Sequence, residues 1–95
     1  MADFSSLYNH HEREVFAAVA GAAAAHPAIG RDADLLCDVA CVALNRLPPR
    51  YIRHEVDFSF YMTPNERHEI DTAINEAVSF AFQFVEARVA LRKTA

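Results

Sequence analysis

A pair of prolines directly after a long apolar run is the feature that most constrains the fold of this 95-residue chain. The run covers residues 35–47 and is interrupted only by Asp38, Asn45 and Arg46. Its apolar residues recur at the three- and four-residue spacing that is typical of a helix. Pro48 and Pro49 end that helix, because proline lacks the backbone N–H and disfavours the helical conformation in the residue before it. We therefore predict a helix over residues 32–47, followed by a rigid bend that we call the proline corner (residues 47–50).

The predicted helix is apolar on nearly all of its faces, and such a helix is usually buried on nearly all of them. Cys37 and Cys41 are accordingly expected to be buried and inert. Because the chain shows no export signal, they are also expected to be free thiols without a disulfide bond. The alternative is that they form half of a zinc site with two of the histidines at positions 26, 54 and 68. Asp38 and Asn45 would need partners in a buried setting, which would be backbone groups, a ligand or a second subunit.

Capping motifs predict a helix on either side of this central one. The first is expected over residues 6–25, where Asn9 and Glu12 resemble a capping box. The last begins at the capping box of residues 63–66, which has proline at the first helical position, and runs to about Arg92.

The last helix carries two apolar stripes. One stripe consists of Ile70, Ile74, Ala77, Ala81 and Phe84, and the other of Val78, Phe82, Val85 and Val89. One stripe suffices to pack on the other two helices, so the second is expected to pack on another copy of the chain. The apolar fraction of 53% is high for so short a chain, which also favours burial between chains. A symmetric homodimer is therefore predicted.

Between the second and last helices, over residues 53–62, the pattern changes to period two. Apolar residues at 56, 58, 60 and 62 alternate with residues 55, 57, 59 and 61, as in a half-buried strand. Such a strand either pairs with the same strand of a second copy or lies extended and packs by its side chains. The expected fold is mainly helical: a single domain over residues 1–95, with three helices and a short extended or β segment between helices two and three.

Composition narrows the class of function. The formal net charge of −4 argues against binding to a nucleic-acid polymer. Neither a leader peptide nor a membrane span is expected, and the predicted location is cytoplasmic. His10 and His11 beside Glu12 and Glu14 indicate a solvated helix start, with a metal site as the alternative. Without a catalytic Ser/His/Asp or Cys/His pattern or a glycine-rich phosphate loop, we expect a binding protein with no catalytic residue, metal or cofactor, and not an enzyme.

Arginines cluster at the proline corner. Arg46, Arg50 and Arg53 are spaced around the two prolines, and Tyr51 and the proline rings offer flat surfaces on which a base can stack. Guanidinium groups bind phosphate with two hydrogen bonds at once. This pattern predicts a small anion or nucleotide site. The alternative is that Arg46 and Arg50 bind the last carbonyls of the helix and pair with nearby acids.

Residues 38–40 and 43–51, with the string Ala-Leu-Asn-Arg-Leu-Pro-Pro-Arg-Tyr, resemble the ComFB family of late competence proteins. The resemblance extends over most of the chain. It implies a small, mainly helical homodimer that acts through a protein partner not yet identified. Some cyanobacterial members bind cyclic dinucleotides, so the resemblance implies a receptor for cyclic-di-GMP or, less favoured, cyclic-di-AMP.

The ligand would then lie at the corner, near the two-fold axis of the dimer. The expected ligand-binding residues are Asn45, Arg46, Pro49, Arg50, Tyr51 and Arg53. In this hypothesis the arginines hold the phosphates and Tyr51 stacks on a base. The alternative function is that of a ligand-free dimeric adaptor, in which the proline corner is purely structural and the acidic surface contacts other proteins.

Overall fold

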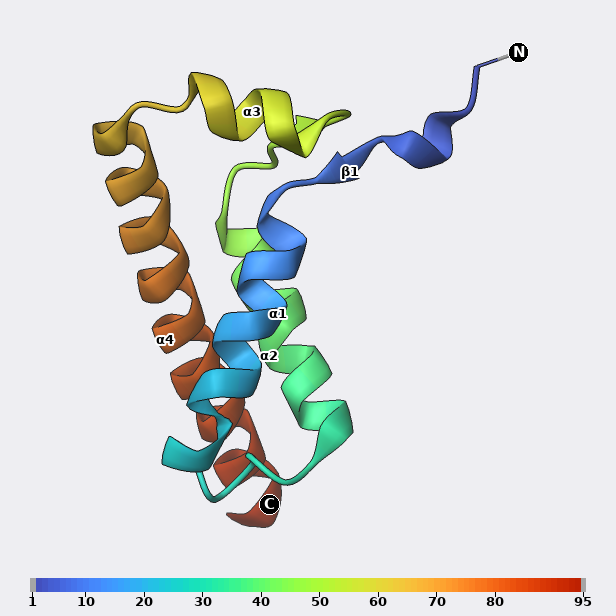
Figure 1. Ribbon diagram of the computed structural model, residues 1–95. Coiled ribbons are helices and arrows are strands. Elements are labelled where there is room, and N and C mark those ends of the chain that lie inside the picture. The colour runs from blue at the N-terminus through green and yellow to red at the C-terminus, as the bar shows by residue number, and fades with distance from the viewer. Residues whose placement is uncertain (1, 95) are drawn as a thin grey trace.

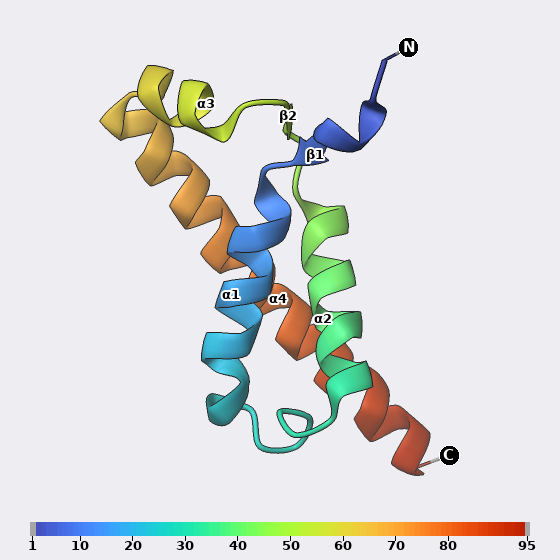
Figure 2. The ribbon, with the colours of Figure 1, turned by 45° about the vertical axis from the view of Figure 1, so that its right-hand side comes forward.

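Three helices, α1 (His11–Ala22), α2 (Ala33–Arg46) and α4 (Pro64–Thr94), lie side by side and build the body of the protein (Figures 1 and 2). The structure is a computed structural model that describes residues 2–94, without the side chains of residues 55, 57, 59 and 94. The smaller elements are η1 (Phe4–Ser6), β1 (Tyr8–Asn9), η2 (Ala23–Ala25), β2 (Tyr51–Ile52) and α3 (Glu55–Tyr61). The mainly helical fold predicted from the sequence is confirmed.

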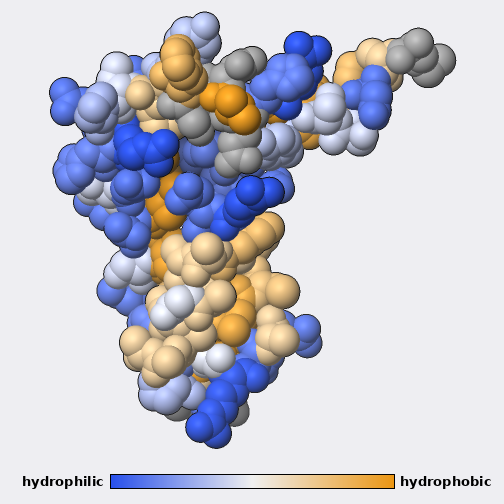
Figure 3. All heavy atoms as spheres, viewed as in Figure 1, coloured by the Kyte–Doolittle hydropathy of each residue, from blue (hydrophilic) through white to orange (hydrophobic). Residues whose placement is uncertain are grey.

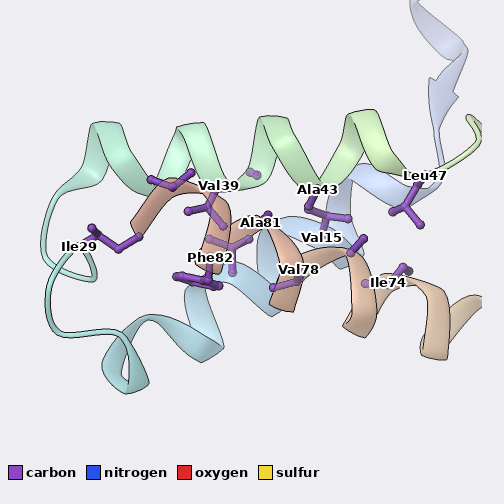
Figure 4. Packing of buried hydrophobic residues seen from close by; sticks show 13 residues of the cluster. Val15, Ile29, Val39, Ala43, Leu47, Ile74, Val78, Ala81 and Phe82 are labelled. Carbon is purple, nitrogen blue, oxygen red and sulfur yellow. The ribbon is translucent and has the colours of Figure 1, made fainter. Parts of the chain in front are cut away.

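The core fills the space between the three long helices (Figure 4). Phe82 of α4 is its largest fully buried side chain. The other core residues are Val15, Val19, Ile29, Val39, Ala40, Ala43, Leu47, Ile74, Ala77, Val78, Ala81 and Val85. Burial of this apolar surface holds the bundle together.

Local capping fixes where the helices begin and end. The Asp32 carboxylate accepts hydrogen bonds from the backbone N–H groups of residues 34 and 35, at 3.0 and 3.1 Å. The Thr63 hydroxyl accepts one from the backbone N–H of Glu66 at 3.1 Å. Each bond satisfies a donor that has no partner inside its helix. Both predicted starts are confirmed, and α2 ends at Arg46 with Leu47 as its C-cap.

A two-stranded antiparallel sheet joins the N-terminal arm to the segment after the proline corner. Tyr8 pairs with Ile52, and Asn9 pairs with Tyr51. Because β1 uses these residues, α1 begins at His11 and not at residue 6. The predicted short β segment between the second helix and the last one therefore exists at Tyr51–Ile52.

The predicted strand over residues 53–62 is wrong, because residues 55–61 form helix α3. β1 pairs with residues 51 and 52 only, so the residues that follow have no neighbouring strand in this sheet with which to form backbone hydrogen bonds. A helix satisfies its backbone groups internally and needs no partner strand. Val56 and Phe60 stay about four-fifths exposed, at 81% and 79%, whereas Phe58 is half-buried. Figures 1 and 2 show α3 lying across one end of the bundle.

At the opposite end, the turn between α1 and α2 packs on α4. The ring of His26 stacks on that of Phe82, with centroids 4.0 Å apart and planes 9° apart. Its Nδ1 lies 2.6 Å from Oε1 of Glu86. Gly30 lies so close to the preceding turn that a Cβ there would be 2.9 Å from the carbonyl oxygen of His26. A side chain at this position is incompatible with the turn.

Two predictions about burial are wrong. Both apolar stripes of α4 are largely buried inside this chain, because α1 and α2 pack on the side of α4 that carries them, and Phe80 and Phe84 remain partly exposed. The outer face of α2 is open, so that Cys37 and Cys41 are exposed. Asp38 and Asn45 are exposed as well.

The structure was also searched for helices that could cross a membrane. Within residues 2–94, no helix combines the necessary length with the necessary apolar character.

Candidate functional site at the proline corner

Asn9 holds the proline corner against the start of α1. Its side-chain oxygen accepts hydrogen bonds from the backbone N–H groups of Arg50, at 3.1 Å, and of His11, at 3.2 Å. In addition, the backbone N–H of His10 donates to the carbonyl of Arg50 at 2.7 Å. Both backbone groups of Arg50 are thus bonded to the segment before α1, which fixes the backbone from which its guanidinium projects.

Two of the predicted arginines rest on aromatic rings. The guanidinium carbon of Arg46 lies 3.8 Å from the centre of the Phe80 ring on α4. That of Arg50 lies 4.8 Å from the centre of the Phe58 ring on α3. Among the side chains that the structure describes, neither arginine forms a salt bridge with a carboxylate. Stacking on an aromatic ring restricts the position of each guanidinium.

A groove runs between the proline corner and α4. It contains a hollow of about 250 Å³ whose wall includes His11, Pro48, Pro49, Arg50 and Glu69, and which we call the corner hollow. A second hollow of about 220 Å³ continues from it past Leu47 and Pro48 to Arg46 and Glu76. A third, of about 210 Å³, adjoins Arg50 on the side of Phe58 and Glu66. Arg46 and Arg50 thus lie at two points of one groove.

The other predicted ligand residues lie elsewhere. Asn45 is exposed and donates from its side chain to the carbonyl of Cys41 at 3.0 Å. Tyr51 is 69% exposed on β2, and Arg53 follows it in an exposed position. None of these three residues contributes to the three hollows described above. Pro49, in contrast, forms part of the wall of the corner hollow.

His10 and His11 are buried, so the predicted solvated helix start is wrong. They are 8% and 7% exposed. The His10 ring lies 4.4 Å from the Phe58 ring, between centroids, which secures α3 over the start of α1. Nδ1 of His11 is inaccessible to solvent and has no hydrogen-bond partner among the described residues.

Electrostatics at His11 favour the neutral ring. Burial is the main cause that lowers the pKa of His11, and the neighbouring His10 lowers it further. A backbone hydrogen bond with Pro48 raises the pKa, the charge of Arg50 lowers it, and that of Glu14 raises it. The downward causes prevail.

The groove carries acidic as well as basic groups. Glu69 and Glu76 belong to its α4 wall, opposite the arginines. Carboxylates repel phosphate but accept hydrogen bonds from the N–H groups of a base. The groove therefore offers different chemistry at different points, which suits a ligand that has both anionic and base-like parts.

His11, Phe58, Glu69 and Phe80 are contributors that the sequence analysis missed. Glu69 and Glu76 are seven residues apart and flank the apolar stripe of α4, which is a signal that places both on one edge of that helix. The burial of His11 has no comparable signal, because it depends on the contact between Asn9 and the corner.

Cys37 and Cys41 lie away from this groove. They border an apolar hollow of about 580 Å³ between α1 and α2, together with Phe16, Leu36 and Leu44. Within the described part of the chain, no three His, Cys, Asp or Glu residues gather into a metal-binding cluster.

Comparison with known proteins gives one match. The sequence model of the family described as "Late competence development protein ComFB" matches residues 8–89 of the chain. These residues include both strands, the proline corner and all but the end of α4. No curated protein and no solved structure matches the chain.

Proposed function

Because the chain belongs to the ComFB family, we propose that it is a small dimeric regulatory protein that binds a cyclic dinucleotide at the proline corner. It acts on a protein partner in the cytoplasm and catalyses no reaction. Cyclic-di-GMP is the favoured ligand and cyclic-di-AMP the second choice. The observation that carries the proposal is a pair of guanidinium groups in one groove, neither of which pairs with a carboxylate among the described side chains.

Arg46 and Arg50 are suited to hold phosphate. Each guanidinium has one face against an aromatic ring, on Phe80 and Phe58, which leaves the N–H groups along its edge for an anion. Stacking and the rigid corner restrict the two side chains before any ligand binds. Less conformational entropy is then lost on binding, which strengthens the complex.

The corner hollow is suited to a nucleobase. Its volume is about 250 Å³, and the rings of Pro48 and Pro49 give it a flat apolar wall. Arg50 borders this hollow, so one residue contacts both base and phosphate in the proposed complex. A mostly apolar cavity with a few polar groups is typical of small-molecule sites.

The exposed surface supports a dimer. The chain exposes 6928 Å², whereas a compact monomer of 10.6 kDa exposes about 5,500 Å². Stable interfaces bury about 800 Å² on each partner. The area that this chain exposes beyond that of a compact monomer is larger than this value. Figure 3 shows apolar residues gathered over the lower part of the molecule, where the apolar hollow lies between α1 and α2. We place the seam between the two copies on this face.

Titration calorimetry tests the receptor function. Cyclic-di-GMP and cyclic-di-AMP are titrated into the wild type, Arg46→Ala, Arg50→Ala and the control Arg31→Ala. Arg31 is exposed in the turn before α2, at the far end of that helix from the corner. We expect binding to the wild type and the control, with at least about tenfold loss in each corner variant. Absence of heat with both nucleotides on the wild type refutes the receptor function.

One observation favours a second function, that of a ligand-free adaptor. Leu47 is buried, and the backbone N–H and carbonyl of Arg50 are hydrogen-bonded to residues 9 and 10. The corner therefore already stabilises the fold. In this case Pro48→Ala disturbs the dimer, nucleotides have no effect, and light scattering of the wild type and Pro48→Ala reveals the difference. A monomer at all concentrations contradicts both functions.

A further inference from the structure

Helix α3 has few contacts with the rest of the protein. It lies across one end of the bundle, between β2 and the start of α4 (Figures 1 and 2). Among the described residues, the extensive contacts between elements join α1, α2 and α4 to one another, α1 to η2 and β1 to β2, and α3 takes part in none of them. Val56, Phe60 and Tyr61 of α3 are largely exposed. A small number of side chains therefore hold α3 in place.

Phe58 is the side chain that joins α3 to the proline corner. Its ring lies 4.4 Å from that of His10, between centroids, and 4.8 Å from the guanidinium carbon of Arg50. Phe58 is half-buried. Phe60, two residues later, is exposed, and its ring lies against that of Tyr61 in the same helix. We infer that the docking of α3 depends on Phe58 and not on Phe60.

Arg50 borders two hollows at once. On one side it forms part of the wall of the corner hollow, and on the other side it lines the hollow of about 210 Å³ that Phe58 also lines. The backbone of Arg50 is fixed by hydrogen bonds to Asn9 and His10. A single guanidinium on a fixed backbone therefore lies between the proposed ligand site and the ring of Phe58.

The shape of α3 depends on its docking. Isolated helices shorter than about 12–15 residues are marginal in water, and α3 has only 7 residues. It therefore needs its contacts with the body of the protein in order to stay helical. The rate at which its backbone amides exchange hydrogen with the solvent then reports how often α3 leaves the bundle.

We propose, on the basis of the nucleotide binding proposed above, that the contact between Arg50 and Phe58 couples the ligand site to α3. Phe58 is a positioning residue: its ring holds the guanidinium of Arg50 in place for a phosphate, so that less entropy is lost on binding. The bound phosphate in turn holds Arg50 in the position in which it contacts Phe58. Ligand binding and the docking of α3 strengthen each other by the same factor, as linkage requires. The nucleotide thereby controls how firmly α3 presents its exposed apolar side chains.

The experiment compares Phe58→Leu with its matched control Phe60→Leu. Both variants replace an aromatic ring of α3 by the same residue, but the first removes the ring on which Arg50 rests. Phe58→Tyr keeps that ring and is the rescue variant. Hydrogen exchange of the α3 amides is followed by NMR, with and without a saturating concentration of whichever of cyclic-di-GMP and cyclic-di-AMP binds the wild type. Calorimetry gives the dissociation constants.

The ligand-free protein tests the contact itself. We expect Arg50→Ala to accelerate exchange of the α3 amides about twofold to fivefold, which corresponds to the loss of a cation–π contact at an exposed site. In the Phe58→Leu background the same substitution should have no further effect. Unchanged exchange in Arg50→Ala, or an equal acceleration with and without the Phe58 ring, overturns the coupling and leaves the receptor function intact.

The nucleotide tests the coupling. It should slow exchange of the α3 amides at least about twofold in the wild type and in Phe60→Leu, but not in Phe58→Leu. Phe58→Leu should bind the nucleotide about twofold to fivefold more weakly than the wild type, whereas Phe58→Tyr and Phe60→Leu bind it equally well. If Phe58→Leu matches Phe60→Leu in either measurement, the coupling is overturned.

Two further outcomes have a defined meaning. If the wild type binds neither nucleotide, the receptor function fails and the coupling fails with it, even where the ligand-free protein shows the contact. If Phe58→Leu does not fold, Arg50→Ala decides, because Arg50 is exposed and its loss leaves the core intact. Exchange of the α3 amides that is as slow in Arg50→Ala as in the wild type then overturns the coupling.

Discussion

The side-chain oxygen of Asn9 lies 3.1 Å from the backbone nitrogen of Arg50, 41 residues away in the sequence. The same oxygen accepts from the backbone N–H of His11, so one atom joins the proline corner to the first turn of α1. Both donors are N–H groups, and the amide must therefore present its oxygen. The position of the Arg50 guanidinium depends on a residue that itself has no place in the groove.

We expect Asn9→Ala to lower the free energy of unfolding by about 1–3 kcal/mol, because the backbone N–H groups of His11 and Arg50 lose their acceptor. Asn9→Asp retains an oxygen at this place and should cost less than half as much. Urea denaturation of the three proteins measures the difference. Equal losses in Asn9→Ala and Asn9→Asp would show that the two hydrogen bonds contribute little.

The two glycines should respond to alanine in opposite directions. A Cβ at Gly21 has no atom within 4 Å and lies in helix α1, so Gly21→Ala should stabilise the protein by about 0.5–1 kcal/mol. A Cβ at Gly30 would overlap the backbone of Ala23 and His26, and Gly30→Ala should destabilise by about 1–3 kcal/mol. Thermal unfolding of the two variants at equal protein concentration measures both effects. A loss of stability in Gly21→Ala would indicate that another molecule approaches this face closely.

Stability should decrease in weak acid because of His11. The pKa of His11 is lower in the folded protein than its ordinary value of 6.5. Below about pH 6.5 the unfolded chain therefore binds a proton at His11 that the folded chain does not bind, and unfolding becomes more favourable. Above this pH the contribution is constant.

Urea midpoints of the wild type and His11→Gln between pH 7.5 and pH 5 test this dependence. The wild type should lose more stability over this range than the variant does. Parallel curves would show that His11 titrates alike in the folded and unfolded states. His68→Gln, at an exposed position, should follow the wild type.

The apolar hollow between α1 and α2 should control the oligomeric state. Phe16 is 51% exposed there, so Phe16→Glu leaves the core intact but places a charge in the proposed seam. We expect a dimer for the wild type and a monomer for this variant, by light scattering. Val56→Glu is the control, because Val56 is 81% exposed on α3. A dimer that persists in Phe16→Glu would place the seam on another face.

The sequence predicted the fold best where the signal is local. Asp32 and Thr63 cap helices through bonds that span two or three residues, and both predicted starts lie within one residue of the observed ones. The bend after Leu47 follows from the covalent structure of proline. The ligand-binding role of Arg46, Arg50 and Arg53 stays a prediction, although Arg46 and Arg50 line neighbouring hollows of one groove and Arg53 does not.

The failures share a different cause, which is contact between distant segments. Residues 53–62 alternate as a strand does, but β1 pairs only with Tyr51 and Ile52, and without a partner the segment is helical. His11 looks like a surface residue until Asn9 brings the corner over it. Neither the lack of a partner strand nor the contact of Asn9 with the corner can be recognised from the spacing of apolar residues in the sequence.

The pairing of Tyr8 with Ile52 has a consequence for the order of assembly during synthesis. It closes a loop that contains all of α1 and α2, whereas the core is completed only when α4, with Phe82, has left the ribosome and packs on these two helices. The second wall of the groove, from Glu69 to Glu76, belongs to α4 as well. Arg46 and Arg50 therefore leave the ribosome before the helix that forms the opposite wall of their groove.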